Sequence, residues 1–371
     1  MIMDGVAFMS SDTGQSDTGL RIEASDGKQI ITLNRPKALN ALNLQMIRTM
    51  YPKLKEFESD PKVKLVILTG EGHKAFCAGG DVRAVTESGL AGTSICQDFF
   101  REEYKLNYLI GTYKLPFVAV VDGITMGGGV GLSVHGMYRV ATDRTMYAMP
   151  ETAIGLFPDV GGSYFLSRLR GKIGLFMGLT GQRLIGTDVY HAGIATHFVH
   201  NEQLPGLLSS LESLKADEIT VESVGAVLAE FQEKSGDLGH FSLEKEEEKI
   251  NKLFGAPSVE EIVENLEKDH SEFAQKHLAS LRKMSPTSMK VTFRQLEEGA
   301  KQSFREVFTM EYRLSQRFVE DKKDFYEGVR AVLIDKCGSP KWDPATLEGV
   351  TKEKLDWYFS PLPPDRELIL V

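Results

Sequence analysis

An apolar run followed closely by a glycine triplet constrains this chain more than any other feature. Residues 117–121 are all apolar and indicate a buried strand, and Gly127, Gly128 and Gly129 come a few residues later. Glycine lets the backbone turn tightly and brings bare N–H groups against a ligand. A helix is predicted over residues 130–137, and the first N–H groups of a helix have no partner within it, which suits its start to negative charge. Such a site can stabilise the oxyanion of an acyl group under attack.

The first part of the chain alternates strand and helix patterns. Residues 30–33 and 65–69 are short apolar runs typical of strands, whereas residues 43–58 and 94–109 have the apolar spacing of helices. Alternation of this kind predicts an α/β fold in which helices join parallel strands.

Beyond residue 221 the strand patterns fade and helical patterns dominate. Ser258 and Glu261 form a capping box that opens a predicted helix, and Phe304, Phe308 and Tyr312 make an apolar stripe on a later one. We therefore expect three parts: a disordered N-terminal segment at 1–19, a core that holds the site at 20–221, and a mostly helical region at 222–371.

The composition argues against several classes of protein. A net charge of −9 and a pI near 5.5 argue against a broad nucleic-acid-binding face. The three cysteines, Cys77, Cys96 and Cys337, form no zinc-binding or disulfide pattern, which suits a reducing compartment. No apolar run reaches the roughly 18 residues of a spanning helix, so no membrane segment is expected.

The N-terminal residues bear on localisation. Asp4, Asp12 and Asp17 lie there, and no lysine or arginine precedes Arg21, which is unlike a basic mitochondrial transit peptide. A cleaved or replaced leader stays an open alternative. The last residues do not match the peroxisomal tripeptide.

A second glycine cluster, Gly79 and Gly80, follows the strand predicted at 65–69 by way of a loop. If adjacent parallel strands bring both glycine loops to one edge, an N–H group from each can converge on a single oxygen. Tight turns or close helix packing are the alternative explanation of these glycines.

Two carboxylates follow the glycine triplet. Glu151 comes after Pro150 at the end of a predicted strand, and Asp159 lies in a turn that ends in Gly161 and Gly162. Acids in apolar, glycine-rich surroundings tend to have shifted proton affinity and to act as acid, base or nucleophile. Their alternatives are structural, since acids are common in turns and at helix starts.

Several motifs in the same order resemble the crotonase (enoyl-CoA hydratase/isomerase) superfamily. They are ITLNRPKALNAL at 31–42, FCAGGD at 76–81, GITMGGG at 123–129 and Pro150-Glu151. The resemblance covers residues from about 20 to 342 and implies a spiral ββα core with a helical C-terminal region. It also implies an acyl-CoA thioester substrate and an oxyanion hole made by the N–H groups of Gly80 and Gly128.

The chain departs from the hydratases of that superfamily at one position. Gly131 stands where they carry a glutamate after the triplet, while Glu151 corresponds to their second glutamate and Asp159 is not typical of them. The departure disfavours hydration. Further motifs resemble the thioester hydrolases of the superfamily: FFREEY at 99–104, GLSVHG at 131–136, ETAIGLFPDVGG at 151–162, RKMSPTS at 282–288 and DFYEGVRA at 324–331.

The resemblance to these hydrolases gives roles to the acids. It implies that Glu103 lies near the 3-hydroxyl group of a 3-hydroxyacyl-CoA. We also expect Glu151 and Asp159 to bind the substrate, Glu151 to activate water or to attack the thioester directly, and Asp159 to orient it or assist proton transfer. From its pattern alone, Glu103 would be a solvated acid on a helix. His135 and Cys77 are weak catalytic candidates, because lone side chains of both kinds are more often core residues.

The resemblance also sets expectations for ligands and location. CoA is part of the substrate, and no cofactor or metal is expected, because the two amides themselves supply the electrophilic assistance to the thioester carbonyl. Lys37, Arg83 and Lys114 are candidates for contacting the CoA phosphates. A mitochondrial enzyme is implied, with a cytosolic or peroxisomal location and a homo-oligomer left open. The alternatives are a crotonase-type isomerase or hydratase, and a non-catalytic relative attached to a mitochondrial ribosome.

Overall fold

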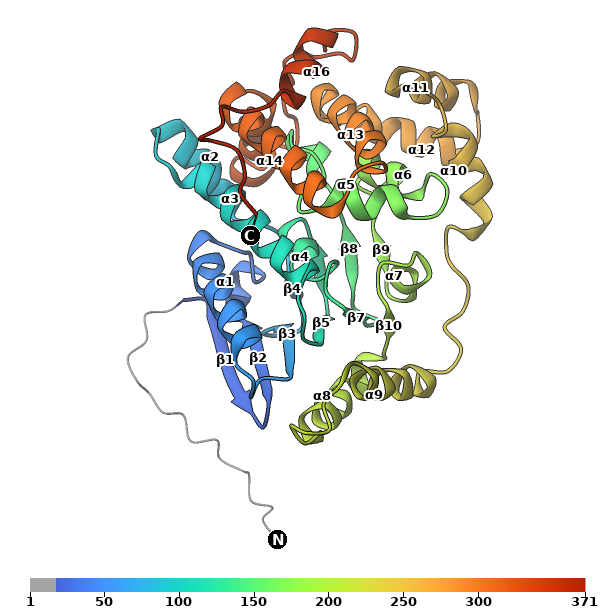
Figure 1. Ribbon diagram of the computed structural model, residues 1–371. Coiled ribbons are helices and arrows are strands. Elements are labelled where there is room, and N and C mark those ends of the chain that lie inside the picture. Colours follow the sequence, from blue (N-terminus) through green and yellow to red (C-terminus); the bar gives the residue numbers. More distant parts are fainter. Residues whose placement is uncertain (1–17, 371) are drawn as a thin grey trace.

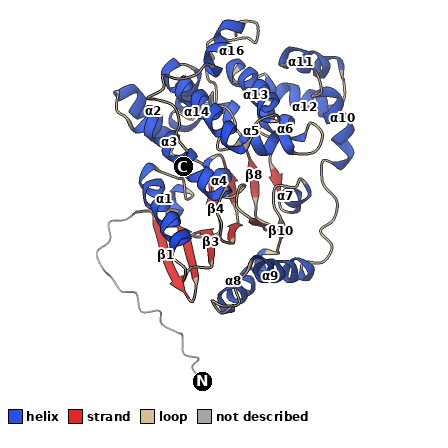
Figure 2. Ribbon diagram, viewed as in Figure 1, coloured by secondary structure: helices blue, strands red, loops and turns tan. Residues whose placement is uncertain are grey.

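The computed structural model describes residues 18–370, in which strands at the centre are surrounded by helices (Figures 1 and 2). The disordered segment expected at 1–19 falls almost wholly outside the described residues. The strands are β1 (Leu20–Ser25), β2 (Lys28–Leu33), β3 (Leu65–Gly70), β4 (Ala75–Cys77), β5 (Phe117–Val121), β6 (Ile124–Met126), β7 (Tyr138–Ala141), β8 (Met146–Ala148), β9 (Leu184–Ile185) and β10 (His197–Phe198).

The helices lie along the whole described chain and form most of its later part. They are α1 (Leu44–Ser59), α2 (Val82–Ala91), α3 (Ile95–Gly111), α4 (Gly128–Gly131), α5 (Gly162–Phe165), α6 (Ile173–Thr180), α7 (Thr187–His191), α8 (Leu204–Ser213), α9 (Val221–Lys234), α10 (Glu247–Leu253), α11 (Val259–Lys268), α12 (Glu272–Leu281), α13 (Pro286–Gly299), α14 (Phe304–Asp321), α15 (Asp324–Val329) and α16 (Lys352–Phe359).

Successive pairs of strands build two sheets side by side. The large sheet has the order β1-β2-β3-β5-β7-β10 and the small sheet the order β4-β6-β8-β9. From β3 to β8, consecutive strands therefore alternate between the sheets: β3, β5 and β7 join the large sheet, and β4, β6 and β8 join the small one. Pairing between β2, β3, β5, β7 and β10 is parallel, as it is between β4, β6 and β8. This spiral of ββα units confirms the predicted fold.

Strands β3 and β5, in the middle of the large sheet, are mainly apolar because both of their faces are covered. In β3, Leu65 and Ile67 pack in the cluster formed with α8 and α9, while Val66 and Leu68 pack in the main core. Alternate side chains of a strand point to opposite faces, so a strand between two helical layers needs apolar residues at every position. Figure 1 shows α8 and α9 across the strands from α10 to α16.

The later part of the described chain is helical, as predicted. Helix α11 begins at Ser258, whose hydroxyl accepts the Glu261 N–H at 3.1 Å. Helix α9 lies just beyond the predicted division at residue 221, yet its Val224 and Leu228 pack in the cluster under the large sheet. The division into a core and a helical region stays a prediction. Within residues 18–370, no helix combines the length and apolar character needed to cross a bilayer.

One predicted element is wrong. The helix expected over residues 130–137 is replaced by the single turn of α4 and a series of tighter turns. The Ser133 N–H donates to the Val130 carbonyl and the Gly136 N–H to that of Ser133, both at 3.0 Å. Gly129, Gly131 and Gly136 fit because the backbone is tightly packed there, and glycine in turn weakens a helix.

Candidate active site

The two glycine loops meet, as their positions after neighbouring strands predicted. Strands β4 and β6 are parallel partners, and Gly80 and Gly128 follow them. A Cβ atom placed on Gly128 would lie 3.1 Å from the Gly80 nitrogen. Neither of these two N–H groups donates a hydrogen bond within residues 18–370. The loops therefore present two unused donors close together, which is the arrangement that an oxyanion requires.

Both loops open on a cavity of about 380 Å³ that also contains the three acids singled out from the sequence. Glu103 is 2% exposed, and Glu151 and Asp159 are each 5% exposed. The solvated position considered for Glu103 is therefore wrong. The other residues that line this acid cavity are mainly apolar and include Phe99, Phe100, Met126, Ile154, Leu156, Val332 and Leu333.

Glu151 is placed by the end of β8. Glu151 is the first residue of a single 3₁₀ turn, Glu151–Ile154, which directly follows Pro150. One carboxyl oxygen, Oε2, is buried without a hydrogen-bond partner, and the other lies 2.9 Å from where a Cβ atom of Gly127 would be. Burial, then repulsion from Asp159, raises the pKa of Glu151 well above its usual range. Burying a carboxyl group without a partner is costly, so the oxygen is held ready for a ligand.

Asp159 occupies a turn that only a strained backbone can make. Val160 and Gly161, the two residues after it, have φ angles of +53° and +85°. The Tyr104 hydroxyl, from α3, donates to Asp159 Oδ2 at 2.8 Å. Burial raises the pKa of Asp159 to about 7, although the bond from Tyr104 lowers it. A carboxyl group with that pKa can take up and release a proton at neutral pH.

Glu311, on α14, also fixes the turn that carries Asp159. Its role at this turn was not predicted from the sequence. Its two carboxyl oxygens accept the N–H groups of Gly161 and Ser163, each at 2.7 Å. Burial raises its pKa to about 8, against the effect of these bonds. The available signal was an acid among the buried positions of α14, next to the stripe of Phe308 and Tyr312.

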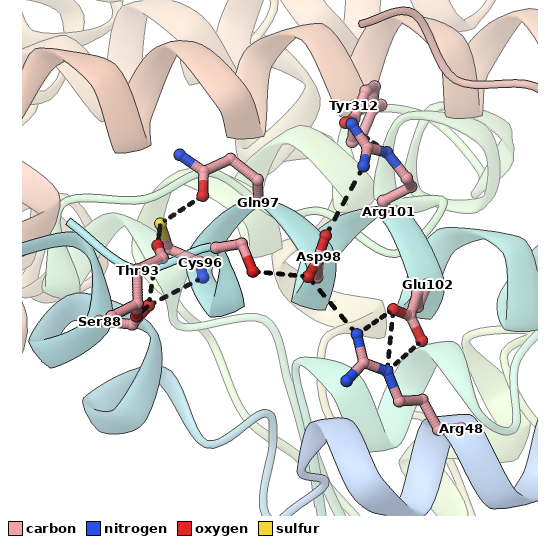
Figure 3. A network of polar contacts seen from close by, with 10 residues as sticks. Arg48, Ser88, Thr93, Cys96, Gln97, Asp98, Arg101, Glu102 and Tyr312 are labelled. Atoms are coloured by element: carbon pink, nitrogen blue, oxygen red, sulfur yellow. Dashed lines mark hydrogen bonds and ion pairs between the residues drawn. The ribbon is translucent and has the colours of Figure 1, made fainter.

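Glu103 reaches the cavity because α3 is anchored on its other side. Figure 3 shows Arg48, on α1, bound to Asp98 and Glu102, and Arg101 bound to the Tyr312 hydroxyl of α14. The inward face of α3 then points Glu103 and Tyr104 at the site. Glu103 Oε1 is buried without a partner, and burial, then Asp159 and Glu151, raise the pKa of Glu103 well above its usual range.

The three acids share one mainly apolar cavity, and within residues 18–370 none of them is ion-paired, although Arg183 lines the cavity as an exposed side chain. No lysine or arginine is among the groups that shift the pKa of Glu103, Glu151 or Asp159. Like charges at such close quarters repel one another, which favours the protonated form of these acids. The arrangement can therefore deliver and accept protons beside the two unused N–H groups. In the described part of the chain, no cluster of histidine, cysteine or acidic side chains is arranged to hold a metal ion.

Comparison with known proteins places this chain in a family. A family model described as enoyl-CoA hydratase/isomerase matches residues 28–359. The chain belongs to this family. Two curated relatives carry the name 3-hydroxyisobutyryl-CoA hydrolase, mitochondrial. The one from Danio rerio is 59% identical over 90% of this chain and 87% of its own length, and the one from Homo sapiens is 54% identical over 95% and 91%.

Solved structures show the same enoyl-CoA hydratase/isomerase fold. A carnitinyl-CoA dehydratase from Mycobacterium thermoresistibile is 36% identical with a TM-score of 0.87, covering 95% of this chain and 98% of that one. An enoyl-CoA hydratase from Rhodobacter sphaeroides 2.4.1 is also 36% identical, with a TM-score of 0.86 and coverage of 95% and 100%. The curated hydrolases are thus considerably more similar in sequence than these structures.

Position 131, where the resemblance places a glutamate in family members that hydrate, has no room for one here. A Cβ atom on Gly131 would lie 2.6 Å from Val160 Cβ and 2.8 Å from the Asn107 amide nitrogen. Contacts under 3.0 Å require something to move, and Val160 belongs to the strained turn after Asp159. The turn that presents Asp159 therefore occupies the space that a side chain at position 131 would need.

The remaining candidates from the sequence fall outside the acid cavity. Cys77 is fully buried, and burial raises its pKa to about 12, while burial lowers the pKa of His135 to about 4, so neither is set up as a nucleophile or base. Lys37, Arg83 and Lys114 are exposed and do not line the cavity, although Arg83 follows Val82, which does.

Three lining residues were missed by the sequence reasoning. Arg183 lines the cavity as an exposed side chain just before β9, and Val332 and Leu333 reach it from the π-helical turn Arg330–Ile334. They come from segments far from the glycine motifs in the chain, and nothing in the local pattern signals their position.

Proposed function

We propose that this chain hydrolyses the thioester of 3-hydroxyisobutyryl-CoA, and of 3-hydroxypropionyl-CoA, to the free hydroxy acid and CoA. One observation carries the proposal: a single cavity places Glu151 and Asp159 beside the unused N–H groups of Gly80 and Gly128. The high identity to curated hydrolases over most of both chains supports the same substrate. A two-glutamate hydration mechanism is disfavoured, since Gly131 leaves no space for the first of the two glutamates, the one that would follow the glycine triplet.

The thioester carbonyl is the electrophile. When a nucleophile attacks its carbon, negative charge develops on its oxygen, and the N–H groups of Gly80 and Gly128 stabilise that charge without rearrangement. Collapse of the tetrahedral intermediate breaks the C–S bond, and the CoA thiolate leaves and takes up a proton. The apolar walls, among them Phe99 and Leu156, strengthen these hydrogen bonds by excluding water.

Glu151 and Asp159 supply the attacking group by one of two routes. In the first, Glu151 removes a proton from water, which attacks the carbonyl carbon, and Asp159 orients the water or passes the proton on. In the second, the Glu151 carboxylate attacks directly, expels the thiolate and forms an anhydride, which water then opens. The unpartnered Oε2 of Glu151 suits either route.

A single turnover in oxygen-18 water detects the anhydride route when water opens the anhydride at the glutamyl carbon. Anhydride opening at the glutamyl carbon transfers label to the protein, which mass spectrometry of the peptide containing Glu151 detects. Label confined to the hydroxy acid is the result expected if water attacks the substrate carbonyl.

Glu103 gives the site its preference for a 3-hydroxyacyl group. Its Oε1 has no partner in the described chain and lies next to Gly128, since a Cβ atom there would be 2.6 Å away. An acyl hydroxyl group that donates to this oxygen satisfies a buried acid, whereas an acyl group without a hydroxyl leaves it unpaired.

The proposal extends to the setting of the enzyme. The names of the curated relatives support a mitochondrial location. The resemblance to these hydrolases implies that the reaction belongs to valine breakdown. CoA enters as part of the substrate, and the chain acts alone or as a homo-oligomer. Neither nucleic acid nor a membrane is a partner in this proposal.

A thiol-release assay tests the function directly. The wild type should release CoA from 3-hydroxyisobutyryl-CoA and 3-hydroxypropionyl-CoA, and Glu151→Gln should lower turnover by roughly a hundredfold or more. Consumption of crotonyl-CoA without thiol release would instead indicate a hydratase or isomerase. No turnover together with stable co-sedimentation with ribosomes would favour the non-catalytic alternative. Full activity in Glu151→Gln would refute the role of this acid.

A further inference from the structure

A second cavity, of about 460 Å³, lies behind the turn that carries Asp159. It shares no lining residue with the acid cavity. Its walls come from the end of α3, the turns after α4, β7, α5 with the 3₁₀ turn that follows, the loop after α7 and the start of α14. The residues that matter for its chemistry are Val134, His135, Arg139, Tyr164, Arg168 and Phe304.

The two arginines of this second cavity have no acidic partner in residues 18–370. Arg139 donates to the carbonyl oxygens of Ile194 and Gly136 at 2.9 and 3.0 Å. Arg168 donates to backbone carbonyls too, including that of Gln302 at 2.9 Å. By contrast, Arg170 is paired with a glutamate at 2.9 Å. A chain with a net charge of −9 thus keeps two positive charges unbalanced in one hollow.

The environment of the arginines favours an anion further. Burial lowers the pKa of Arg139, and no carboxylate offsets the effect. A guanidinium group that is partly removed from water without a counter-ion gains from an oxyanion, which it can bind with two parallel hydrogen bonds.

Aromatic rings form much of the remaining wall. The Arg168 guanidinium lies 3.7 Å from the centre of the Tyr164 ring, and the Phe304 ring is 5.0 Å from those of Tyr164 and His135. Rings of this kind pack against a flat apolar body. We propose that the second cavity binds a small organic anion, with its carboxylate or phosphate group at Arg139 and Arg168 and its apolar part against Tyr164 and Phe304.

The second cavity is connected to the catalytic turn through one side chain. His135 Nε2 lies 2.7 Å from the carbonyl oxygen of Val160, the residue after Asp159. A carbonyl only accepts, so Nε2 carries the proton, and Nδ1 has no hydrogen-bond partner within the described residues. A ligand in the cavity therefore touches a ring whose resonances can report its presence.

Calorimetry and histidine NMR on the full chain test this site. The probes are benzoate, 3-hydroxyisobutyrate, phenyl phosphate and inorganic phosphate. At least one organic probe should bind and shift the His135 resonances, and Arg168→Gln should weaken binding at least about tenfold, since a charge-assisted bond is lost. Arg168→Lys should be intermediate. Arg170→Gln is the matched control, a neighbouring arginine outside the cavity, and should bind as the wild type does.

Two further measurements identify the class of ligand and control for misfolding of the arginine variant. Tighter binding of benzoate than of phenyl phosphate assigns a carboxylate, and the reverse order assigns a phosphate ester. Thr112→Trp fills the cavity from its rim, keeps both arginines and should also abolish binding. The proposal fails if no probe binds, if Arg168→Gln and Thr112→Trp both bind normally, or if binding is lost only in Glu151→Gln. Because no turnover is measured, this outcome is independent of the proposed hydrolase activity.

Discussion

Glu102 and Glu103 are neighbours on α3 and have opposite environments. Glu102 faces outward, where Arg48 grips both of its carboxyl oxygens at 2.6 to 3.0 Å (Figure 3). Glu103 faces the acid cavity, is 2% exposed and has an oxygen without a partner. The outer acid is satisfied and the inner acid is not. The unusual proton affinity of Glu103 thus results from burial without a paired cation, and no additional group is needed to produce it.

The same contrast applies to the two sides of α3 as a whole. Outside, Asp98 and Glu102 are bound by arginines, and these contacts fix the helix to α1 and α14. Inside, burial raises the pKa of Glu103, Glu151 and Asp159 together. Buried unpaired acids lower the free energy of unfolding. The ion pairs on the outer face of α3 therefore have to offset the cost of the buried acids on its inner face.

The largest expected effect comes from filling the inner side. In Gly128→Ala, the new methyl group would lie 2.6 Å from Glu103 Oε1 and 3.1 Å from the Gly80 nitrogen, where the oxyanion should sit. Loss of one oxyanion donor costs about 3 kcal/mol, so turnover should fall about a hundredfold. Steady-state thiol release measures the change, and a thermal melt checks the fold. Near-normal turnover in a folded variant would mean that the carbonyl binds elsewhere.

The inner acid itself should have the next largest effect. Glu103→Ala removes the acceptor for the substrate hydroxyl, so kcat/KM for 3-hydroxyisobutyryl-CoA should fall at least about tenfold. The value for isobutyryl-CoA, which has no hydroxyl, should change much less. Competition between the two substrates in thiol-release assays gives the ratio. An equal loss on both would show that Glu103 supports the structure of the site and does not select the substrate.

A smaller, pH-dependent effect should follow from the hydroxyl that supports Asp159. A carboxyl group acts as a base only above its pKa, so activity should rise with pH through about 7, the pKa of Asp159. The Tyr104 hydroxyl lowers that pKa, so Tyr104→Phe should move the rising limb to higher pH and lose more activity at pH 6 than at pH 9. Tyr108→Phe, one turn along α3, is the control. A limb that stays in place would exclude Asp159 as the titrating group.

More of the acid cavity itself could be predicted from the sequence than of the residues that support it. Gly80, Gly128 and Glu151 stand out because each comes after a strand, and parallel strands bring their ends to one edge, whereas Asp159 stands out because of its glycine-rich turn. Glu311 and Leu333 could not be placed, because their contact with the site depends on how the helices after α9 pack back over it. Local periodicity shows that those residues are helical but not which part of the core they touch.

The helix predicted over residues 130–137 failed for a related reason. Its apolar residues have helical spacing, but Gly131 and Gly136 lie where Cβ atoms would meet Val160 and Phe117 at under 3.0 Å. Tertiary packing therefore decides that segment. Sequence patterns predicted the residues that line the acid cavity close to the glycine loops. The residues that support them from other helices depend on long-range packing.

The smallest expected effect is on the outer side and completes the comparison. Glu102→Ala removes the carboxylate that Arg48 grips but leaves the cavity intact, so stability should fall by at most about 1 kcal/mol, as for other solvent-exposed ion pairs. The preference for 3-hydroxyisobutyryl-CoA over isobutyryl-CoA should be unchanged. Urea unfolding and the same competition assay measure the two quantities. If Glu102→Ala lowered the preference as far as Glu103→Ala does, anchoring of α3 would determine selectivity, and a free carboxyl group in the cavity would not explain it.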